Sequence, residues 1–342
     1  MQLFGKDLDR QVVVVAEIGS NHEGDPDAAR RLIRLAAAAG ADAVKFQTFT
    51  PKRFVAADDA ERLARVSKFR LDEAAHRQLV KEAADAGIAM FSTAVTEDVL
   101  PLLGELFPAV KIASGDLDFE PVIRGAARTG KPVLLSTGLG DVEEIDRAVD
   151  WVAQTIDVPP AERLVLMHCV SAYPAPLEEA NLLSIPFLAE RYRLPIGYSN
   201  HVVGLEAPLA AIALGASVVE VHFTDQREGR TFRDHHLSLM PDELADLVTR
   251  AQRIKASRGR FGKSRQPSEL PYLWTIRKGI AAARDLEAGR ELAREDLMFA
   301  RPATEFRAAD IDQVLGRRLA VALPAGSQLR RAHLAEADDR AA

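Results

Sequence analysis

The stretch Ile196-Gly-Tyr-Ser-Asn-His-Val202, together with Ser217-Val-Val-Glu-Val-His-Phe-Thr224, decides the fold of this chain. Each is a short run of strand-forming residues that delivers a histidine, His201 or His222, where a loop begins. Residues 204–215 between them have a helical pattern closed by glycine, which predicts two consecutive parallel strands with neighbouring carboxyl ends. Two neutral imidazoles at one place can hold a divalent metal ion and leave its other positions to water and substrate oxygens. Two unrelated buried histidines are the alternative.

An apolar run, a polar turn and an amphipathic helix follow one another eight times along the chain. The apolar runs are Val12–Val15, Ala43–Phe46, Ala89–Ser92, Val110–Ala113, Val133–Ser136, Leu164–Met167, Ile196–Tyr198 and Val218–Val221. The helical patterns cover Asp27–Ala39, Asp72–Ala86, Glu97–Leu106, Glu120–Thr129, Val142–Gln154, Glu178–Glu190, Leu205–Leu214 and Pro241–Ala256. Such short, wholly apolar runs are typical of strands buried on both faces. Eight units in about 250 residues predict an α/β fold, a closed (β/α)8 TIM barrel. The loop 18–24 lacks the glycine spacing of a dinucleotide-binding open sheet.

Polar residues stand where the predicted strands end. They are Glu17, Lys45, Gln47, Ser92, Lys111, Ser114, Ser136, His168, Ser171, Tyr173, Tyr198, His201 and His222. A barrel of this kind carries its active site at the carboxyl ends of the strands, so we expect these side chains to converge. Lys45 and Lys111 both follow apolar strands, which indicates a site for phosphate or carboxylate. A single lysine at such a place is more often a surface residue with its ammonium group in water.

The composition limits the class of protein. The chain has 342 residues, 47% of them hydrophobic, which suffices for one large core and a small second domain. A net charge of −6 argues against a nucleic-acid or anionic-membrane surface. The single cysteine, Cys169, excludes an intramolecular disulfide and a cysteine-rich zinc site, and suits a reducing cytoplasm. Without a long apolar run or the apolar core of a signal peptide, a cytoplasmic protein is expected.

The barrel pattern ends near residue 257. We assign residues 1–257 to the barrel, 258–276 to a basic linker containing glycine and proline, 277–336 to a small β-rich domain and 337–342 to a disordered tail. Within the small domain, apolar runs at 279–283, 296–299 and 319–323 are separated by turn-forming residues. About sixty residues form a marginal core, so this domain is expected to dock on something.

Seven motifs in order resemble the sialic acid synthase family, which includes N-acetylneuraminate, legionaminic acid and pseudaminic acid synthases. They are Ala16-Glu-Ile-Gly-Ser-Asn-His-Glu-Gly24, Val44-Lys-Phe-Gln-Thr48, Lys111-Ile-Ala-Ser-Gly-Asp116, Leu135-Ser-Thr-Gly138, His168-Cys-Val-Ser-Ala-Tyr-Pro174, Gly197-Tyr-Ser-Asn-His201 and His222-Phe-Thr224. The resemblance extends from Val12 to Leu334. It implies a barrel followed by a small antifreeze-like (SAF) domain, similar to type III antifreeze proteins.

The resemblance implies that phosphoenolpyruvate condenses with an open-chain N-acylated hexosamine, such as N-acetylmannosamine, and water. The products are a nine-carbon 2-keto-3-deoxy sugar acid and phosphate. By similarity, His201 and His222 hold one divalent ion, manganese first, with magnesium or cobalt as alternatives. Phosphoenolpyruvate is assigned to Lys45, Ser92, Lys111, Ser114, Ser136 and Ser171, and the sugar to Gln47, Tyr173, Tyr198, Asp234, Arg277 and Arg301. Glu17, with Lys45 and Lys111, is assigned a catalytic role, orienting or deprotonating water; its alternative is a structural carboxylate that caps the following helix.

The chain departs from the family pattern on the hexose side of the site. Asn200 precedes the first metal histidine where the family commonly has aspartate, so a carboxylate that would raise imidazole basicity is missing. Val221 stands where a lysine often precedes the second histidine. The downstream Gly-Pro-Asp-His pattern appears as Phe232-Arg-Asp-His-His236, which leaves Asp234 as its carboxylate.

The family places the small domain over the partner's barrel in a domain-swapped homodimer, with Arg301 as the matching lid arginine. Arg277 lies near another basic lid position, and either arginine could instead be a solvated surface residue. Two other functions stay open. One is a metal-dependent enzyme that condenses phosphoenolpyruvate with another aldose, which would not need the lid. The other is a sugar-binding barrel without catalysis.

Overall fold

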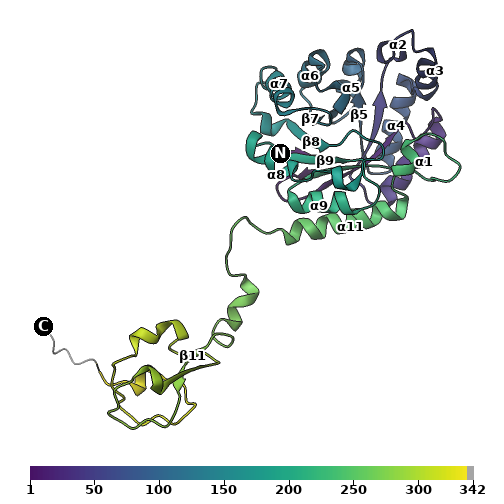
Figure 1. Ribbon diagram of the computed structural model, residues 1–342. Coiled ribbons are helices and arrows are strands. Elements are labelled where there is room, and N and C mark those ends of the chain that lie inside the picture. The colour runs from purple at the N-terminus through teal and green to yellow at the C-terminus, as the bar shows by residue number, and fades with distance from the viewer. Residues whose placement is uncertain (337–342) are drawn as a thin grey trace. The chain divides into compact units, whose positions relative to one another are not determined.

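The computed structural model describes residues 1–336 and divides the chain into two compact units, with the boundary between Gly259 and Arg260 (Figure 1). Each unit is described by itself. The predicted disordered tail, 337–342, lies outside the described residues.

The first unit is a closed barrel of eight parallel strands in which β10 pairs with β3. The strands are β3 (Val13–Gly19), β4 (Ala43–Thr48), β5 (Ala89–Ala94), β6 (Val110–Ile112), β7 (Val133–Ser136), β8 (Leu164–Cys169), β9 (Ile196–Asn200) and β10 (Val218–His222). Their positions confirm the predicted (β/α)8 barrel. Closure leaves no strand edge unpaired. The register sets Glu17 beside both Lys45 and His222, so three predicted site residues occupy adjoining positions on neighbouring strands.

Helices surround the strands (Figure 1). They are α1 (Pro26–Ala38), α4 (Glu73–Asp85), α5 (Leu100–Leu106), α6 (Glu120–Arg128), α7 (Val142–Ala153), α8 (Ser184–Tyr192), α9 (Glu206–Leu214) and α11 (Pro241–Ser257). Apolar residues on one face dock each helix, as Val122, Ile123 and Ala126 of α6 do. The predicted helix 178–190 is wrong in its first half. Asn181 adopts a left-handed conformation, with φ of 41°, and its amide donates to Ser184 Oγ, so α8 begins only at Ser184.

Several short elements were not predicted. A hairpin of β1 (Gln2–Leu3) and β2 (Lys6–Asp7) precedes the barrel, and α2 (Pro51–Phe54), α3 (Ala60–Phe69) and α10 (Asp234–Leu237) lie in connections that the sequence pattern left open. The short 3-10 helices are η1 (Glu97–Val99), η2 (Ser114–Asp116), η3 (Pro160–Glu162), η4 (Leu177–Glu179), η5 (Pro267–Tyr272), η6 (Arg294–Asp296), η7 (Ala308–Gln313) and η8 (Arg331–His333). The hairpin packs near the amino ends of the strands, because Lys6 Nζ donates to the Val12 carbonyl and pairs with Asp42.

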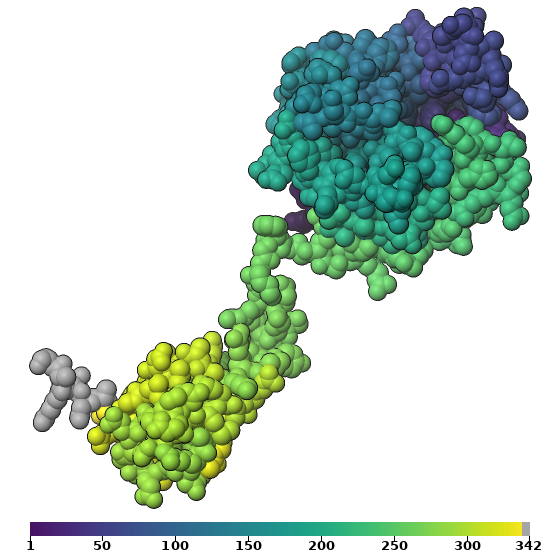
Figure 2. Space-filling model, in the orientation of Figure 1, coloured from purple at the N-terminus to yellow at the C-terminus, as the bar shows by residue number. Residues whose placement is uncertain are grey.

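The second unit is built around one antiparallel pair, β11 (Gly279–Ala282) with β12 (Leu297–Ala300). A core that includes Ile280, Phe306 and Leu329 fills the space between turns, so the small β-rich domain is confirmed. The run 319–323 contributes isolated bridges rather than a strand. Figure 2 shows the side chains within the second unit, at the yellow end of the colour bar, packed closely against one another. No helix in residues 1–336 combines the length and apolar character that crossing a membrane requires.

Candidate active site

A cavity of about 1030 Å3 opens at the carboxyl ends of the barrel strands. It is lined by ten of the predicted site residues: Glu17, Lys45, Gln47, Lys111, Ser114, Ser136, Tyr173, His201, His222 and Asp234. Its volume lies at the upper end of the range for small-molecule sites, about 300–1,000 Å3. One cavity can therefore hold two substrates together.

Two buried lysines and two buried carboxylates meet at the floor of this cavity. Lys45 Nζ lies 2.9 Å from Glu17 Oε2 and 3.6 Å from Glu220 Oε1, and it donates to Thr93 Oγ1 at 2.8 Å. Lys111 Nζ lies 3.5 Å from Glu220 Oε1. Glu220 was missed in the sequence, although a carboxylate two residues before His222 in an apolar strand must share its face. Lys45 is surrounded by protein partners, whereas Lys111 has one.

The two carboxylates differ in their pKa values. Burial raises the pKa of Glu17 to about 7, although the Lys45 ammonium opposes the shift. Burial also acts to raise the pKa of Glu220, but Lys111 and Lys45 outweigh it and lower this pKa to about 2. For Lys111, burial lowers the pKa and Glu220 compensates only in part. Glu17 can therefore exchange a proton near neutral pH, while Glu220 remains an anion that holds both lysines.

The two histidines at the cavity wall are neutral and close together. Burial lowers the pKa of His201 to about 4 and that of His222 to about 3, and their ring centroids are 5.4 Å apart. His201 Nδ1 donates to the Val170 carbonyl at 2.6 Å, which leaves Nε2 with a free lone pair. His222 Nδ1 is buried without a hydrogen-bond partner, 3.9 Å from Asp234 Oδ2.

This donor set fits a divalent ion with two protein nitrogens. Within residues 1–336, no third histidine, cysteine, aspartate or glutamate completes a protein-only cluster with the pair. Water and substrate oxygens would supply the remaining ligands, as manganese and magnesium prefer.

Comparison with known proteins gives the family. The NeuB family model matches residues 32–263 and the SAF domain model matches residues 277–335. The chain belongs to the NeuB family. It is 34% identical to the N,N'-diacetyllegionaminic acid synthase of Campylobacter jejuni, over 90% of this chain and 96% of that protein. The N-acetylneuraminate-9-phosphate synthase of Homo sapiens is 31% identical, over 83% of this chain and 81% of its own. A crystal structure of the N-acetylneuraminic acid synthetase of Leptospira borgpetersenii, 34% identical, superposes with a TM-score of 0.73 and covers 78% of this chain and 91% of that one.

The chain is thus an enzyme of the NeuB synthase family, and the predicted resemblance is confirmed. Its second unit carries the SAF match, and Arg277 and Arg301 are both exposed on that unit.

Hydroxyl groups of this NeuB-family site are arranged around Gly138. The Gly138 amide donates to Ser114 Oγ at 3.1 Å, and a side chain at this position would collide with the Ser114 and Ser171 hydroxyls. Ser136 Oγ and Ser171 Oγ are both buried without a hydrogen-bond partner, but only Ser136 lines the cavity. The Ser136 hydroxyl is therefore free to bind a ligand oxygen in the cavity that Lys111 also lines.

Two residues predicted to bind substrates, Ser92 and Tyr198, lie behind the strands instead of in the cavity, and so does His168. Ser92 Oγ bonds Thr48 Oγ1 at 2.7 Å, and its neighbour Thr93 faces the cavity, because successive side chains of a strand point to opposite faces. Tyr198 stacks on His168 and donates to Asn200 Oδ1. These positions correct the expectation that Ser92 and Tyr198 contact substrates.

Asn200 shapes the loop that carries His201. Its Oδ1 accepts from the Val202 amide and its Nδ2 donates to the Val202 carbonyl, so the side chain closes a tight turn after β9. The Asn200 side chain thus supports His201 through the backbone. Val221 is 1% exposed and packs into the core.

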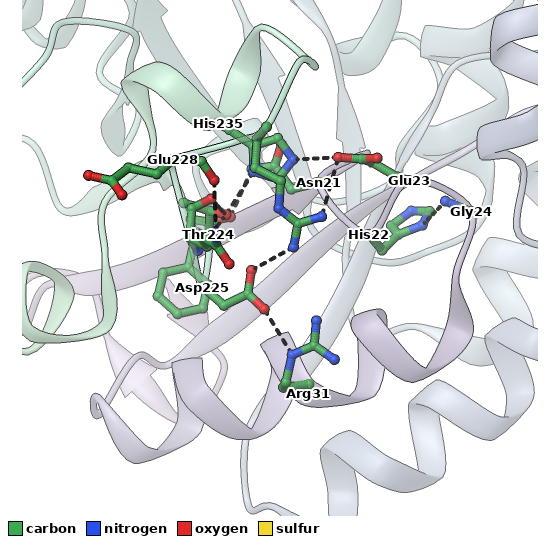
Figure 3. A network of polar contacts seen from close by, with 12 residues as sticks. Asn21, His22, Glu23, Gly24, Arg31, Thr224, Asp225, Glu228 and His235 are labelled. Carbon is green, nitrogen blue, oxygen red and sulfur yellow. Dashed lines mark hydrogen bonds and ion pairs between the residues drawn. The ribbon is translucent and has the colours of Figure 1, made fainter.

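A polar network joins the loop after β3 to the loop after β10 (Figure 3). His235 lies 3.1 Å from Glu23 Oε1 and 2.8 Å from Thr224 Oγ1. Arg230 contacts both Glu23 and Asp225, at 3.5 and 3.3 Å. Because His235 directly follows Asp234, this network fixes a cavity carboxylate across the β3–β10 seam.

Proposed function

We propose that this NeuB-family enzyme condenses phosphoenolpyruvate with the open-chain aldehyde of an N-acetylated hexosamine, N-acetylmannosamine or a relative. C3 of phosphoenolpyruvate bonds to the aldehyde carbon, water adds at C2, and the C2–O bond to phosphate breaks. The products are a nine-carbon 2-keto-3-deoxy sugar acid and inorganic phosphate. One observation carries the proposal. The same cavity, large enough for two substrates, is lined by a buried lysine with a single protein contact, Lys111, and by two neutral imidazoles, His201 and His222.

The donor anion is assigned to Lys111, with the Ser114 and Ser136 hydroxyls beside it. Lys111 has a single protein contact, so its remaining N–H groups are available to phosphate or carboxylate. Lys45 is committed to Glu17, Thr93 and Glu220, and serves mainly to hold these groups in position.

Glu17 is assigned the proton transfer that accompanies capture of the C2 cation by water. Its pKa of about 7 suits a group that takes a proton from water in one step and returns it in the next. Lys45 and Gln47 hold its two oxygens, at 2.9 and 3.3 Å. The carboxylate is thereby oriented before substrates bind.

His201 and His222 would hold the divalent ion, manganese first among the candidates. When bound, the ion would polarise the aldehyde oxygen and stabilise the negative charge that develops there. Asp234, next to His222, and Gln47 are assigned to the sugar hydroxyls, with Tyr173 as an apolar wall against His201.

The SAF domain is proposed to complete the site of a partner chain in a homodimer, with Arg301 and Arg277 offering positive charge to the sugar's acyl group. Two facts support this. Both arginines are exposed on their own unit. The core of a unit of this size is small, so that the unit is only marginally stable by itself.

The test is release of inorganic phosphate from phosphoenolpyruvate with manganese present, with and without hexosamine. Acceptor-dependent release, with a nine-carbon acid found by mass spectrometry, is expected. Release with a shorter sugar phosphate but with no hexosamine would favour the other-aldose enzyme. No release with any aldose would indicate a barrel without catalysis.

A further inference from the structure

We propose that the acceptor of this enzyme carries a phosphate group at the end remote from its aldehyde, and that cations on α3 bind it. These are Arg62, Arg65 and Lys68, called here the mouth cations. The proposal rests on the proposed condensation and specifies the class of its acceptor.

The mouth cations lie on one helical face that lines the cavity. Residues 62, 65 and 68 are spaced three apart, and Val66 and Phe69 of the same face line the cavity with them. Arg53 on α2 and Arg77 on α4 are neutralised, because Arg53 pairs with Glu97 and Arg77 pairs with Glu73 and Glu105. Among the described residues, no carboxylate forms an ion pair with any mouth cation. Three neighbouring cations without counter-charge favour an anionic ligand.

The helix that carries these cations is held against the barrel. Gly24, with φ of 85°, packs so closely that a side chain there would collide with the Lys68 carbonyl. Phe69 meets Phe232 edge to face, with ring centroids 5.2 Å apart. The β3–α1 loop and the loop after β10 therefore both fix α3, and Arg62 is further oriented over the Phe54 ring. Positive charge held in place in this way binds an anion at a lower entropic cost than charge on a free loop.

A continuous row of side chains connects the reacting end with the mouth. The Tyr173 ring lies 4.1 Å from the His201 ring, and the Arg233 guanidinium lies 4.6 Å from the Tyr173 ring. Arg233 adjoins Phe232, which contacts α3. An acceptor whose aldehyde is at the histidines would extend along Tyr173 and bring its far end to Arg233 and the mouth cations.

The donor does not account for these cations. Buried Lys111, which has a single protein contact, already supplies positive charge for the phosphoenolpyruvate anion at the cavity floor. The guanidinium groups at the mouth match a phosphate monoester, whose oxygens accept two parallel N–H bonds. Attraction of the donor toward the cavity is the competing role, and it predicts a different response to mutation.

The experiment compares N-acetylmannosamine with its 6-phosphate as acceptor, at saturating phosphoenolpyruvate, and measures the KM for phosphoenolpyruvate separately at a fixed acceptor concentration. Wild type should show a kcat/KM higher for the phosphorylated acceptor by on the order of 10- to 100-fold, as loss of charged contacts implies. The double variant Arg65→Ala/Lys68→Ala should lose most of this preference. The control Arg53→Ala, on α2, outside the cavity and paired with Glu97, should keep it. The preference should also weaken as salt is raised.

Three outcomes would overturn the proposal. The neutral acceptor could react as well as the phosphorylated one, in which case the condensation stands and the phosphate site fails. The double variant could raise KM for phosphoenolpyruvate and keep the acceptor preference, which would show that the cations attract the donor. If neither acceptor reacts, N-acetylmannosamine and its 6-phosphate are not substrates, and calorimetric titration with N-acetylmannosamine 6-phosphate decides the phosphate site separately. No binding, or equal binding by wild type and double variant, overturns the site.

Discussion

Replacing Lys45 by methionine should affect a different property from replacing Lys111, although both lysines occupy apolar strands of the barrel. Lys45→Met leaves Glu17 without its 2.9 Å partner and removes one of two cations from Glu220. Lys111→Met removes a single contact at 3.5 Å, and Glu220 keeps Lys45 and the Ser199 hydroxyl, the latter at 3.0 Å. The first variant should lose stability and the second should lose affinity for the donor.

The expected magnitudes follow from these contacts. Removing one partner of a buried ion pair costs about 3–5 kcal/mol, and in a domain of about 250 residues each kcal/mol lowers Tm by about 2–4 °C, so Lys45→Met should melt on the order of 10 °C lower. Lys111→Met should change the free energy of unfolding by no more than about 1 kcal/mol, because Glu220 stays compensated. Its KM for phosphoenolpyruvate should rise, or its kcat fall, by on the order of 10²-fold.

The stability loss of Lys45→Met should grow with pH. In wild type, Glu17 has a folded-state pKa of about 7, raised from 4.5 mainly by burial. Between pH 4.5 and 7 the unfolded chain loses this proton while the folded protein keeps it, so the free energy of unfolding falls over this range and levels off above pH 7. Without Lys45 this pKa rises further, and the folded variant keeps its proton above pH 7 while the unfolded chain is ionised. The deficit relative to wild type should therefore increase by up to about 1.4 kcal/mol per pH unit above pH 7.

Calorimetric melting at pH 6, 7 and 8, with phosphate release as a function of phosphoenolpyruvate, measures both effects. Equal changes in Tm for the two variants would refute the assignment of Lys45 as the structural lysine. A wild-type KM and kcat in Lys111→Met would refute its contact with the donor.

Three further outcomes are expected. His222→Ala should retain its far-ultraviolet circular dichroism yet lose manganese binding, measured by electron paramagnetic resonance of the free ion; binding as tight as in wild type would place the metal elsewhere. Mixing inactive His222→Ala and Arg301→Ala chains should recover activity after subunit exchange, since one site of a mixed dimer is then intact, and exchange without recovery would mean that Arg301 does not act in trans. Asp296→Asn should destabilise the SAF domain: burial would raise the pKa of Asp296, but the Ala293 amide and the Arg284 and Arg290 guanidinium groups lower it to about 2. Its stabilisation is thus present above about pH 4 and lost as pH falls through 2, and chemical denaturation that shows no such loss between pH 4 and 2 would contradict this ion-pair role.

The barrel and most of the candidate site could be predicted from the sequence, because both follow from local patterns. Short apolar runs alternating with amphipathic helices specify parallel strands, and parallel strands bring their carboxyl ends together. For that reason Glu17, Lys45, Lys111, His201 and His222 could be grouped before their distances were known.

Other features depend on tertiary structure alone. Whether Ser92 or Thr93 faces the cavity depends on the phase of the strand pleat relative to the closed barrel, which one strand's sequence does not contain. Glu220 acquires its role only when closure of β10 onto β3 brings it to two lysines from other strands. The position of α3 over the cavity depends on contacts with loops far along the chain, at Gly24 and Phe232. Periodicity fixes which residues lie on strands, whereas the pairing of charges and the placement of connections depend on contacts between distant segments, which exist only once the barrel has closed.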